Sequence, residues 1–362
     1  MFDNFYAGKR VLVTGHTGFK GSWLTAWLKQ LGAVVCGIAL DPPTEPDHFS
    51  LLDLDMRSEI FDIRNREKVA ETVADFQPEV VFHLAAQPIV RLSYEIPAET
   101  FEVNVMGTVN ILEACRKNPQ IKAVVVITSD KCYENRETTV GYVESDPMGG
   151  FDPYSASKGC AELAASSYAR SFFNISNYGK THNTLLATAR AGNVIGGGDW
   201  AQDRLVPDIM KAAAAKLPAV IRNPFAIRPW QHVLEPLSGY LLLGKELALG
   251  KIEVAGAWNF GPDDSGIINV KAAAEALQKN YPDIRFEVNT PQNAPHEANL
   301  LTLNCTKAAE KLAWHGVLDS AEMFGFTAGW YERFYNCKEV MTLPQISEYQ
   351  HLAEERGLAW TK

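Results

Sequence analysis

The chain has 362 residues, of which 46% are hydrophobic and 21% are charged, and its formal net charge is -9 at pH 7. This length allows one large or two moderate globular domains with a sizeable core. The acidic balance argues against a nucleic-acid-binding protein, which would show a clustered basic face, but local arginines can still attract an anionic small molecule. No apolar run of about 18 residues predicts a membrane span, and the N-terminus lacks the pattern of a signal peptide.

The six cysteines lie far apart and form no C-x-x-C pair. The sequence therefore indicates neither a disulfide framework nor a zinc site, and no other metal site is predicted. Reduced thiols of this kind fit a cytoplasmic protein.

A glycine-rich turn follows the first predicted strand. Residues 9–14 predict a buried strand, and the apolar spacing of residues 22–31 predicts a helix. Glycines between them would let backbone amides reach a phosphate, and the positive end of the helix would face it. The predicted cofactor residues of this turn are Gly15, Thr17, Gly18, Phe19, Lys20 and Gly21.

A second predicted strand, residues 33–40, ends at Asp41, twenty residues after Gly21. A carboxylate at this place accepts hydrogen bonds from the adenosine ribose hydroxyls. It would repel a 2′-phosphate, and no arginine lies between Asp41 and Pro46 to neutralise one. The sequence therefore predicts NAD rather than NADP, although a glycine-rich turn of an ordinary βα unit is the alternative.

Strands and helices alternate through the next part of the chain. Strands are predicted at residues 58–62, 79–84 and 123–128, and helices at residues 66–76 and 98–117. The last strand is almost entirely apolar, as expected for a central parallel strand that is covered on both faces. We therefore predict an α/β fold, a Rossmann-type doubly wound parallel sheet.

The alternation loosens after about residue 190. Residues 192–200 and 222–232 are predicted to be loops, and short helices are expected at residues 271–278, 306–312 and 320–334. They predict a smaller, discontinuous C-terminal substrate-binding domain. The expected division is residues 1–190 plus 232–262 for the cofactor-binding domain and residues 191–231 plus 263–362 for the smaller domain.

Two clusters of reactive side chains follow the strand at residues 123–128. Ser129, Asp130 and Lys131 stand at its carboxyl end, where open α/β sheets bind ligands. Tyr154 and Lys158 have i, i+4 spacing at the start of a helix, so that both face the same side. The alternative for this pair is an exposed tyrosine beside a solvated lysine.

The chemistry of a sugar oxidation explains why tyrosine and lysine would be paired. A free phenol titrates near pH ~10, and lowering its pKa by about three units takes roughly 4 kcal/mol. An ammonium at about 4 Å supplies that order of energy at an effective dielectric constant near 20. Tyr154 would then act as the base that takes the hydroxyl proton, with Ser129 bonded to the same hydroxyl.

Taken together, these motifs resemble the extended short-chain dehydrogenase/reductase superfamily over most of the chain. The residues that carry the resemblance are Gly15-x-x-Gly18-x-x-Gly21, Asp41, Asp62-Ile63, His83-Leu84-Ala85-Ala86-Gln87, Asn104 and Tyr154-x-x-x-Lys158. Residues 17–23, 87–94, 127–133, 190–200 and 228–235 resemble more narrowly the 4,6-dehydratases that act on CDP-D-glucose.

That resemblance implies a reaction. C4 of CDP-glucose is oxidised, the C5 proton and the C6 hydroxyl leave as water, and hydride returns to C6, giving CDP-4-dehydro-6-deoxy-D-glucose for the deoxysugars of lipopolysaccharide O-antigen. Protonated Asp130 would donate to the departing hydroxyl and neutral Lys131 would remove the C5 proton. Related dTDP-glucose dehydratases carry Thr-Asp-Glu at this place, so Lys131 departs from their pattern and could instead support an enolate electrostatically.

The resemblance also implies the remaining contacts. Asn104 has the alternative of an exposed or internally bonded amide within its helix. The implied cofactor contacts are Asp62, Ile63, Leu84, Ala85, Ala86, Gln87, Asn104, Thr128, Tyr154 and Lys158. The implied substrate contacts are Gln87, Arg91, Asn193, Arg204, Val206, Arg222, Arg228 and His296.

Three further expectations follow from the resemblance. NAD is regenerated in each turnover, so it would stay bound. The helices that begin at Ala98 and Tyr154 resemble the pair that builds a homodimer interface in this superfamily. Neither nucleic acid nor a membrane is expected as a partner. Three alternatives remain open. They are a nucleotide-sugar C4 epimerase, a dehydratase of another nucleotide sugar such as the inverting UDP-N-acetylglucosamine dehydratases, which also carry Asp-Lys, and a non-catalytic NAD-binding protein.

Overall fold

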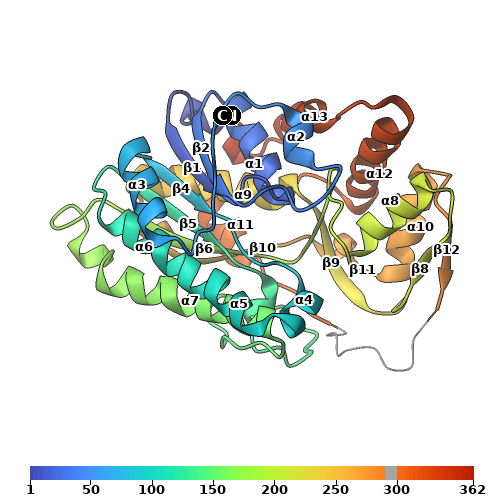
Figure 1. The fold of residues 1–362 in the computed structure, drawn as a ribbon, viewed down its shortest axis with the longest axis horizontal. Helices are drawn as coiled ribbons and strands as arrows, with labels where there is room; N and C mark the ends of the chain where they lie inside the picture. The colour runs from blue at the N-terminus through green and yellow to red at the C-terminus, as the bar shows by residue number, and fades with distance from the viewer. Residues whose placement is uncertain (290–299) are drawn as a thin grey trace.

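A parallel sheet of seven strands forms the centre of the larger lobe (Figure 1). The computed structural model describes residues 1–289 and 300–362. In spatial order the strands are β10 (Gly256–Phe260), β6 (Leu185–Ala191), β5 (Ala123–Ile127), β4 (Val80–His83), β1 (Arg10–Thr14), β2 (Val34–Ala39) and β3 (Arg57–Ile60). The order reverses between β1 and β4, so the predicted doubly wound α/β fold is confirmed.

Helices cover both faces of this sheet because alternate strand residues point to opposite sides. In β1, Val11 and Val13 join one apolar core, whereas Leu12 joins the other. The first core lies under α1 (Phe19–Gln30) and α9 (Leu234–Ala248). The second lies under α3 (Arg66–Phe76), α6 (Gly107–Arg116) and α7 (Pro153–Ser171).

Local sequence signals fix the ends of these helices. The Asn65 side chain accepts a hydrogen bond from the Lys68 amide at the start of α3, and Gln77 ends the helix in the left-handed region before Pro78. At the start of α7 the Asp152 side chain accepts from the Ser155 amide. The Asp152 cap fixes the start of α7, which carries Tyr154 and Lys158.

The helix predicted at residues 98–117 is divided into three consecutive segments. They are α5 (Pro97–Phe101), the π-helical turn η2 (Glu102–Met106) and α6. The wider π turn contains Asn104, whose amide points inward and is buried. Single π turns of this kind recur near functional sites.

The smaller lobe contains two short sheets and the helices packed on them, at the right of Figure 1. The first sheet consists of β11 (Ile267–Asn269), β9 (Ile227–His232) and β7 (Asn193–Ile195), and the second of β12 (Phe286–Val288) and β8 (Ala219–Ile221). Its helices are α8 (Leu205–Ala214), α10 (Val270–Asn280) and α12 (Ser320–Cys337). Among the described residues, the α-helices of the chain that have not yet been named are α2 (His48–Leu52), α4 (Val90–Glu95), α11 (Thr306–Leu312) and α13 (Thr342–Glu355).

The prediction of loops at residues 192–200 and 222–232 is wrong in part, because these segments contain β7 and β9. Pro229 and the many polar residues of β9 argue against a strand in the sequence. In the structure Pro229 lies opposite Ile267 of β11, and the pairing with β7 begins only at Trp230. Proline has no N–H group to donate, and it is tolerated here because β9 does not yet pair with β7 at this residue.

Contacts between α1 and residues 196–200 join the two lobes. The Trp23 indole donates a hydrogen bond of 2.9 Å to the Gly197 carbonyl. A Cβ atom on Gly197 would lie 1.9 Å from the Trp330 side chain, so only glycine fits there.

Among the residues that the structure describes, no helix is long and apolar enough to cross a bilayer.

Glu235 is a buried carboxylate that ties the C-terminal part of the chain to α9. It accepts hydrogen bonds from the Val317 and Leu318 amides and from the Tyr349 hydroxyl, at 2.7 to 3.1 Å. Burial raises its pKa from 4.5 to about 7, although the three donors favour the charged form.

We predict that Glu235 makes stability depend on pH. Because its pKa is raised in the folded state, the folded protein holds a proton between pH 4.5 and about 7 that the unfolded chain has lost. Stability should therefore fall by about 3 kcal/mol as the pH rises through this window. In Glu235→Gln this loss should disappear, as measured by urea unfolding from pH 4.5 to 8. Glu348→Gln, on the exposed side of α13, should keep the wild-type dependence; equal pH slopes for wild type and Glu235→Gln would contradict the prediction.

Candidate active site

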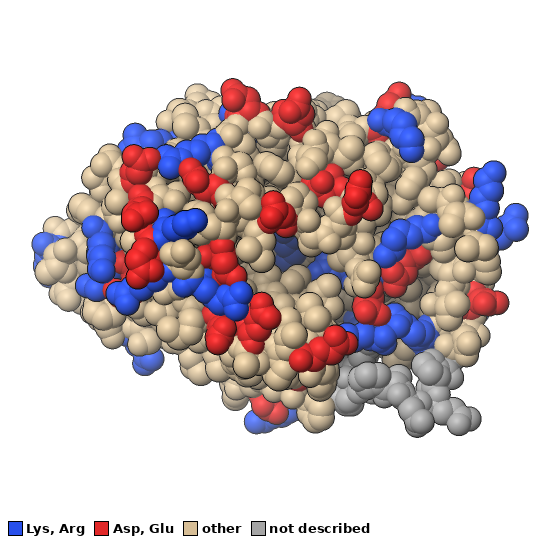
Figure 2. Space-filling view, viewed as in Figure 1, with Lys and Arg blue, Asp and Glu red and all other residues tan. Residues whose placement is uncertain are grey.

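A cavity of about 2390 Å³ lies between the two lobes. Pockets for one small molecule commonly measure about 300–1,000 Å³, so this cavity has room for a dinucleotide and a second ligand. Figure 2 shows it as a hollow near the middle of the molecule, with blue basic side chains inside and red acidic side chains around it. The cavity lies along the carboxyl ends of the central strands, where the strand order reverses.

The glycine-rich turn lines one end of this cavity. Gly15 has a φ of +77°, and a Cβ atom on it would lie 2.8 Å from the Ala85 amide nitrogen. A Cβ atom on Gly21 would lie 2.0 Å from the Gly15 carbonyl oxygen. The turn is therefore packed directly against the end of β4, and Gly18, the N-cap of α1, has no side chain to cover the first amides of the helix. This cradle fits the pyrophosphate of a dinucleotide.

Two predicted carboxylates lie beside the turn. The Thr17 hydroxyl donates 2.9 Å to the Leu40 carbonyl, which holds the strand end that carries Asp41 against the turn. Asp62 lies on the same part of the cavity wall. Burial favours a higher pKa for the Asp62 carboxyl, but hydrogen bonds from the Arg64 guanidinium and amide hold it below its usual range. These residues fit an adenosine with an unmodified ribose.

Asn104 has the internally bonded amide that the sequence left open as the alternative to a cofactor contact. Its carboxamide oxygen accepts a hydrogen bond from the Gln87 amide at 2.8 Å, and its NH2 group donates to the Gln87 carbonyl and the Ser157 hydroxyl at 3.1 and 2.8 Å. Asn104 therefore stands behind the cavity wall and is not among the residues that line it. It fixes the segment after β4 to α7, which positions both.

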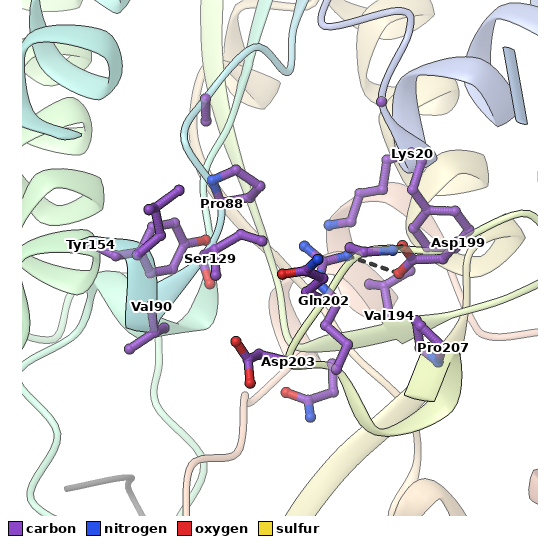
Figure 3. A pocket seen from close by; sticks show the side chains of 18 of the residues that line it. Lys20, Pro88, Val90, Ser129, Tyr154, Val194, Asp199, Gln202, Asp203 and Pro207 are labelled. Atoms are coloured by element: carbon purple, nitrogen blue, oxygen red, sulfur yellow. Dashed lines mark hydrogen bonds and ion pairs between the residues drawn. The ribbon is translucent and has the colours of Figure 1, made fainter. Parts of the chain in front are cut away.

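The predicted catalytic residues converge at the middle of the cavity. Ser129 follows β5, and Tyr154 and Lys158 lie one turn apart at the start of α7. Ser129 lies beside the Tyr154 phenol, and the Lys158 amine donates a hydrogen bond of 3.4 Å to the Ile127 carbonyl oxygen. Figure 3 shows Tyr154 and Ser129 pointing toward each other. The structure thus brings together groups from two elements that are separate in the sequence.

The direction of the Tyr154 pKa differs from the prediction. Burial raises the pKa of the phenol to about 12, and the neighbouring Ser129 hydroxyl, which favours the charged form, offsets only part of this rise. The Lys158 amine is also buried, and its own pKa falls to about 8. Desolvation of both groups outweighs the attraction of the ammonium, on which the sequence argument relied. Protein side chains alone therefore leave the phenol protonated at neutral pH.

Asp130 and Lys131 form a pair beside Ser129. The Asp130 carboxyl is buried, and the Ser129 hydroxyl donates to its Oδ1 atom at 2.8 Å. The Lys131 Nζ atom lies 3.6 Å from the same oxygen, and about a third of its side chain is exposed. A Cβ atom on Gly192 would lie 3.2 Å from the Asp130 Oδ2 atom, so this oxygen faces the smaller lobe. One acid and one base thus stand together where the two lobes meet.

A buried ion pair supports these residues from behind. Arg190 of β6 donates through Nε and Nη2 to the Glu162 carboxylate of α7 at 2.9 and 2.8 Å. The same carboxylate accepts from the Thr128 hydroxyl at 2.5 Å, and Arg190 Nη1 donates to the Tyr133 hydroxyl at 2.6 Å. Sequence patterns do not single out Glu162, because its partner comes from another strand.

Basic side chains line the other half of the cavity (Figure 3). Lys20 points from the glycine-rich turn into the middle of the cavity, and Arg204 donates to Asp199 at 2.9 Å. Burial lowers the pKa of Lys20 to about 7, and the nearby charges of Lys158 and Arg204 act in the same direction. Such a concentration of positive charge favours an anionic ligand.

Most of the predicted site residues line this one cavity. The exceptions are Asn104, described above, and His296, which lies outside the described residues. The predicted residues on its wall are Gly15, Thr17, Gly18, Phe19, Lys20, Gly21, Asp41, Asp62, Ile63, Leu84, Ala85, Ala86, Gln87, Arg91, Thr128, Ser129, Asp130, Lys131, Tyr154, Lys158, Asn193, Arg204, Val206, Arg222 and Arg228.

Comparisons with known proteins identify relatives along nearly the whole chain. Residues 12–324 match the family model described as GDP-mannose 4,6 dehydratase. The chain is 50% identical to a CDP-glucose 4,6-dehydratase of Salmonella typhimurium over 350 residues, which cover 96% of this chain and 97% of the relative. It is 25% identical to a UDP-glucose 4-epimerase of Mycoplasma genitalium, over 91% of this chain and 98% of the relative.

Solved structures share the fold. A UDP-glucose 4-epimerase of Thermus thermophilus in complex with NAD aligns with a TM-score of 0.75 and 23% identity, over 89% of this chain and 99% of that one. An epimerase of Methanothermobacter thermautotrophicus aligns with a TM-score of 0.79 and 22% identity, over 92% and 96%. At this identity the likeness concerns the fold.

We predict that Lys20 gives the cavity a pH-dependent affinity for anions. Because its pKa is about 7, Lys20 is charged below that pH and loses its charge above it. Sulfate, which stays divalent throughout, should bind wild type more tightly at pH 6 than at pH 8.5, and Lys20→Met should bind it about tenfold less tightly at pH 6. Isothermal titration at constant ionic strength measures this. Lys29→Met, at the other end of α1, is the control; an unchanged sulfate affinity of Lys20→Met would refute the assignment.

Proposed function

The chain belongs to the GDP-mannose 4,6-dehydratase family, and we propose that it converts CDP-D-glucose to CDP-4-dehydro-6-deoxy-D-glucose and water. It is then a hydro-lyase that supplies an intermediate of deoxysugar synthesis, such as that of lipopolysaccharide O-antigen. The observation that carries the proposal is the Asp130–Lys131 pair beside Ser129 and Tyr154. An epimerase that only oxidises and reduces C4 has no use for an acid and a base there.

We propose NAD as the cofactor. The glycine-rich turn would hold its pyrophosphate, Asp41 its adenosine ribose, and the wall formed by Leu84–Gln87 and Thr128 the rest of the dinucleotide. When bound, NAD supplies a positively charged hydride acceptor for the sugar. The basic end of the cavity, with Lys20 and Arg204, is then left for the second ligand.

Tyr154 and Ser129 would hold the C4 hydroxyl of the sugar. Burial keeps the phenol neutral, since its pKa is raised to about 12, so the proton leaves it only when a positive charge is near. Lys158, with a pKa of about 8, supplies part of this charge at neutral pH. Tyr154 takes the hydroxyl proton as the C4 hydrogen departs, and it returns a proton when the cycle closes.

Asp130 and Lys131 would perform the elimination. The 4-keto group makes the C5 proton acidic, so elimination follows oxidation. Neutral Lys131 removes the C5 proton and protonated Asp130 donates a proton to the leaving C6 hydroxyl. The nearest atoms of the two side chains lie 3.6 Å apart, so both can reach neighbouring carbons of one sugar ring.

The arginines of the smaller lobe would bind the nucleotide. Arg204, Arg222 and Arg228 line the cavity and present planar guanidinium groups that suit a diphosphate. Asn193 and Val206 line the same region, and Gln87 and Arg91 face it from the larger lobe. We place the CDP group here and the glucose ring between it and Tyr154.

Turnover of CDP-glucose by the pure protein with NAD tests the function. Mass spectrometry and NMR should identify the 4-keto-6-deoxy product; the absence of this product, or equal turnover of UDP- and dTDP-glucose, would contradict the proposal. Asp130→Asn should still oxidise C4 but should eliminate water at least about 100-fold more slowly, because general acids contribute about 10²–10⁴-fold. Lys131→Met should lose exchange of the C5 hydrogen with deuterium from solvent, whereas undiminished exchange would exclude Lys131 as the base.

We also propose a homodimer that works in the cytoplasm. All six cysteines lie in the described part of the chain and are free thiols, which suits a reducing compartment. Met106 of the π turn and Leu163 and Phe172 at α7 are large apolar residues that are 44% to 58% exposed. Such residues on neighbouring helices favour burial against a second copy.

Leu163→Arg should therefore convert the dimer to a monomer, because a charge in the centre of the interface would lose its solvation. Sedimentation velocity measures the change. The control is Leu217→Arg, which places the same charge at an equally exposed leucine of the smaller lobe and should leave the dimer intact. A wild-type protein that sediments as a monomer at micromolar concentration would contradict this part of the proposal.

A further inference from the structure

One acidic side chain bridges two arginines from opposite sides of the cavity. Asp203 Oδ1 accepts from Arg91 Nη1 of α4 at 3.2 Å and from both Nη atoms of Arg222 at 3.3 Å. Arg91 belongs to the larger lobe, and Arg222 follows β8 of the smaller lobe. All three residues line the cavity. The carboxylate thus joins the two lobes at the place where the substrate arginines stand.

The conformation of Asp203 favours this arrangement. Its φ is +57°, in the left-handed region that aspartate and asparagine tolerate better than most residues. The next residue, Arg204, points to Asp199 instead. About a third of each side chain in the Arg91–Asp203–Arg222 cluster is exposed, so solvent and ligands can reach the pairs.

A diphosphate and the Asp203 carboxylate would compete for the same groups. Both are anions with oxygen acceptors that match the N–H donors of arginine. They also repel each other, so a diphosphate bound to Arg91 and Arg222 is destabilised while Asp203 stays in place. Exposed ion pairs are weak, which means that a ligand with two or more negative charges can displace the carboxylate.

We propose that Asp203 is an internal competitor of the substrate diphosphate. It holds the two arginines in position when the cavity has no anion, and it leaves them when the diphosphate binds. Asp203 therefore sets substrate affinity and selects against ligands whose charge is too small to replace it. This inference rests on the proposed function in one respect, namely that the ligand of Arg91 and Arg222 is the diphosphate of a nucleotide sugar.

Asp203→Asn tests the proposal, because the amide keeps the size of the side chain and loses its charge. CDP and inorganic pyrophosphate should bind this variant about three- to tenfold more tightly than wild type in isothermal titration, since two exposed ion pairs no longer oppose them. The KM for CDP-glucose should fall and kcat should change little. Unchanged or weaker binding of both probes would overturn the proposal, because Asp203 would then be neutral or a direct ligand contact.

Two further variants separate the cause from a general charge effect. Glu275→Gln removes one negative charge of the same lobe at an exposed i, i+4 pair with Lys271 and should leave both affinities unchanged. In an Arg91→Gln/Arg222→Gln background, Asp203→Asn should no longer increase the affinity for either probe. A gain in affinity that persists in this background, or an equal gain in Glu275→Gln, would also overturn the proposed role of Asp203. If wild type does not turn over CDP-glucose but Asp203→Asn still tightens pyrophosphate binding, the proposed function fails and the role of Asp203 stands.

Discussion

The active site depends on the buried pair of Glu162 and Arg190. The Glu162 carboxylate accepts hydrogen bonds from the residue after β5 and from two residues of β6. Glu162 itself lies one turn after Lys158 on α7. The Arg190 guanidinium also donates a hydrogen bond to the Tyr133 hydroxyl, and Tyr133 follows the Asp130–Lys131 segment. Buried ion pairs contribute little to net stability, since desolvation offsets their attraction. Their geometry is nevertheless specific, and here it fixes the relative positions of three segments that carry the reacting groups.

The charge of the cavity differs from that of the molecule. The chain has a net charge of -9, yet Lys20, Lys131, Lys158, Arg204 and Arg222 all line one cavity. The cost of bringing these cations together is reduced in three ways. The carboxylates of Asp130, Asp199 and Asp203 pair with some of these cations. Burial lowers the pKa of Lys20 and Lys158 toward neutrality. Part of the arginine surface also stays in contact with solvent. The same features leave the cavity ready to exchange an internal carboxylate for a ligand anion.

Local patterns in the sequence predict the larger lobe well, because its signals are periodic and its strands are buried on both faces. The helix predicted at residues 66–76 agrees with α3, and each of the five predicted strands overlaps an observed one. The smaller lobe is harder to predict, because β7 and β8 have only three residues each, β9 contains a proline and polar residues, and all three pair with partners far along the chain. Most of the predicted site residues that the structure describes line one cavity. The pKa of Tyr154 and the place of Asn104 depend on burial and on tertiary hydrogen bonds, which spacing cannot reveal.

The fold is shared with epimerases, so the choice of reaction must depend on a few side chains rather than on the scaffold. Ser129, Tyr154 and Lys158 are sufficient for moving a proton at one hydroxyl. What elimination adds is a second proton transfer on the neighbouring carbon and a donor to the leaving oxygen. Both can come from Asp130 and Lys131, which occupy consecutive positions after Ser129 in η3 (Asp130–Cys132) and whose charged groups lie 3.6 Å apart. These two residues follow a strand whose end is fixed by Glu162, so under the proposed function a change of two side chains there would alter the chemistry while the supporting hydrogen bond stays in place.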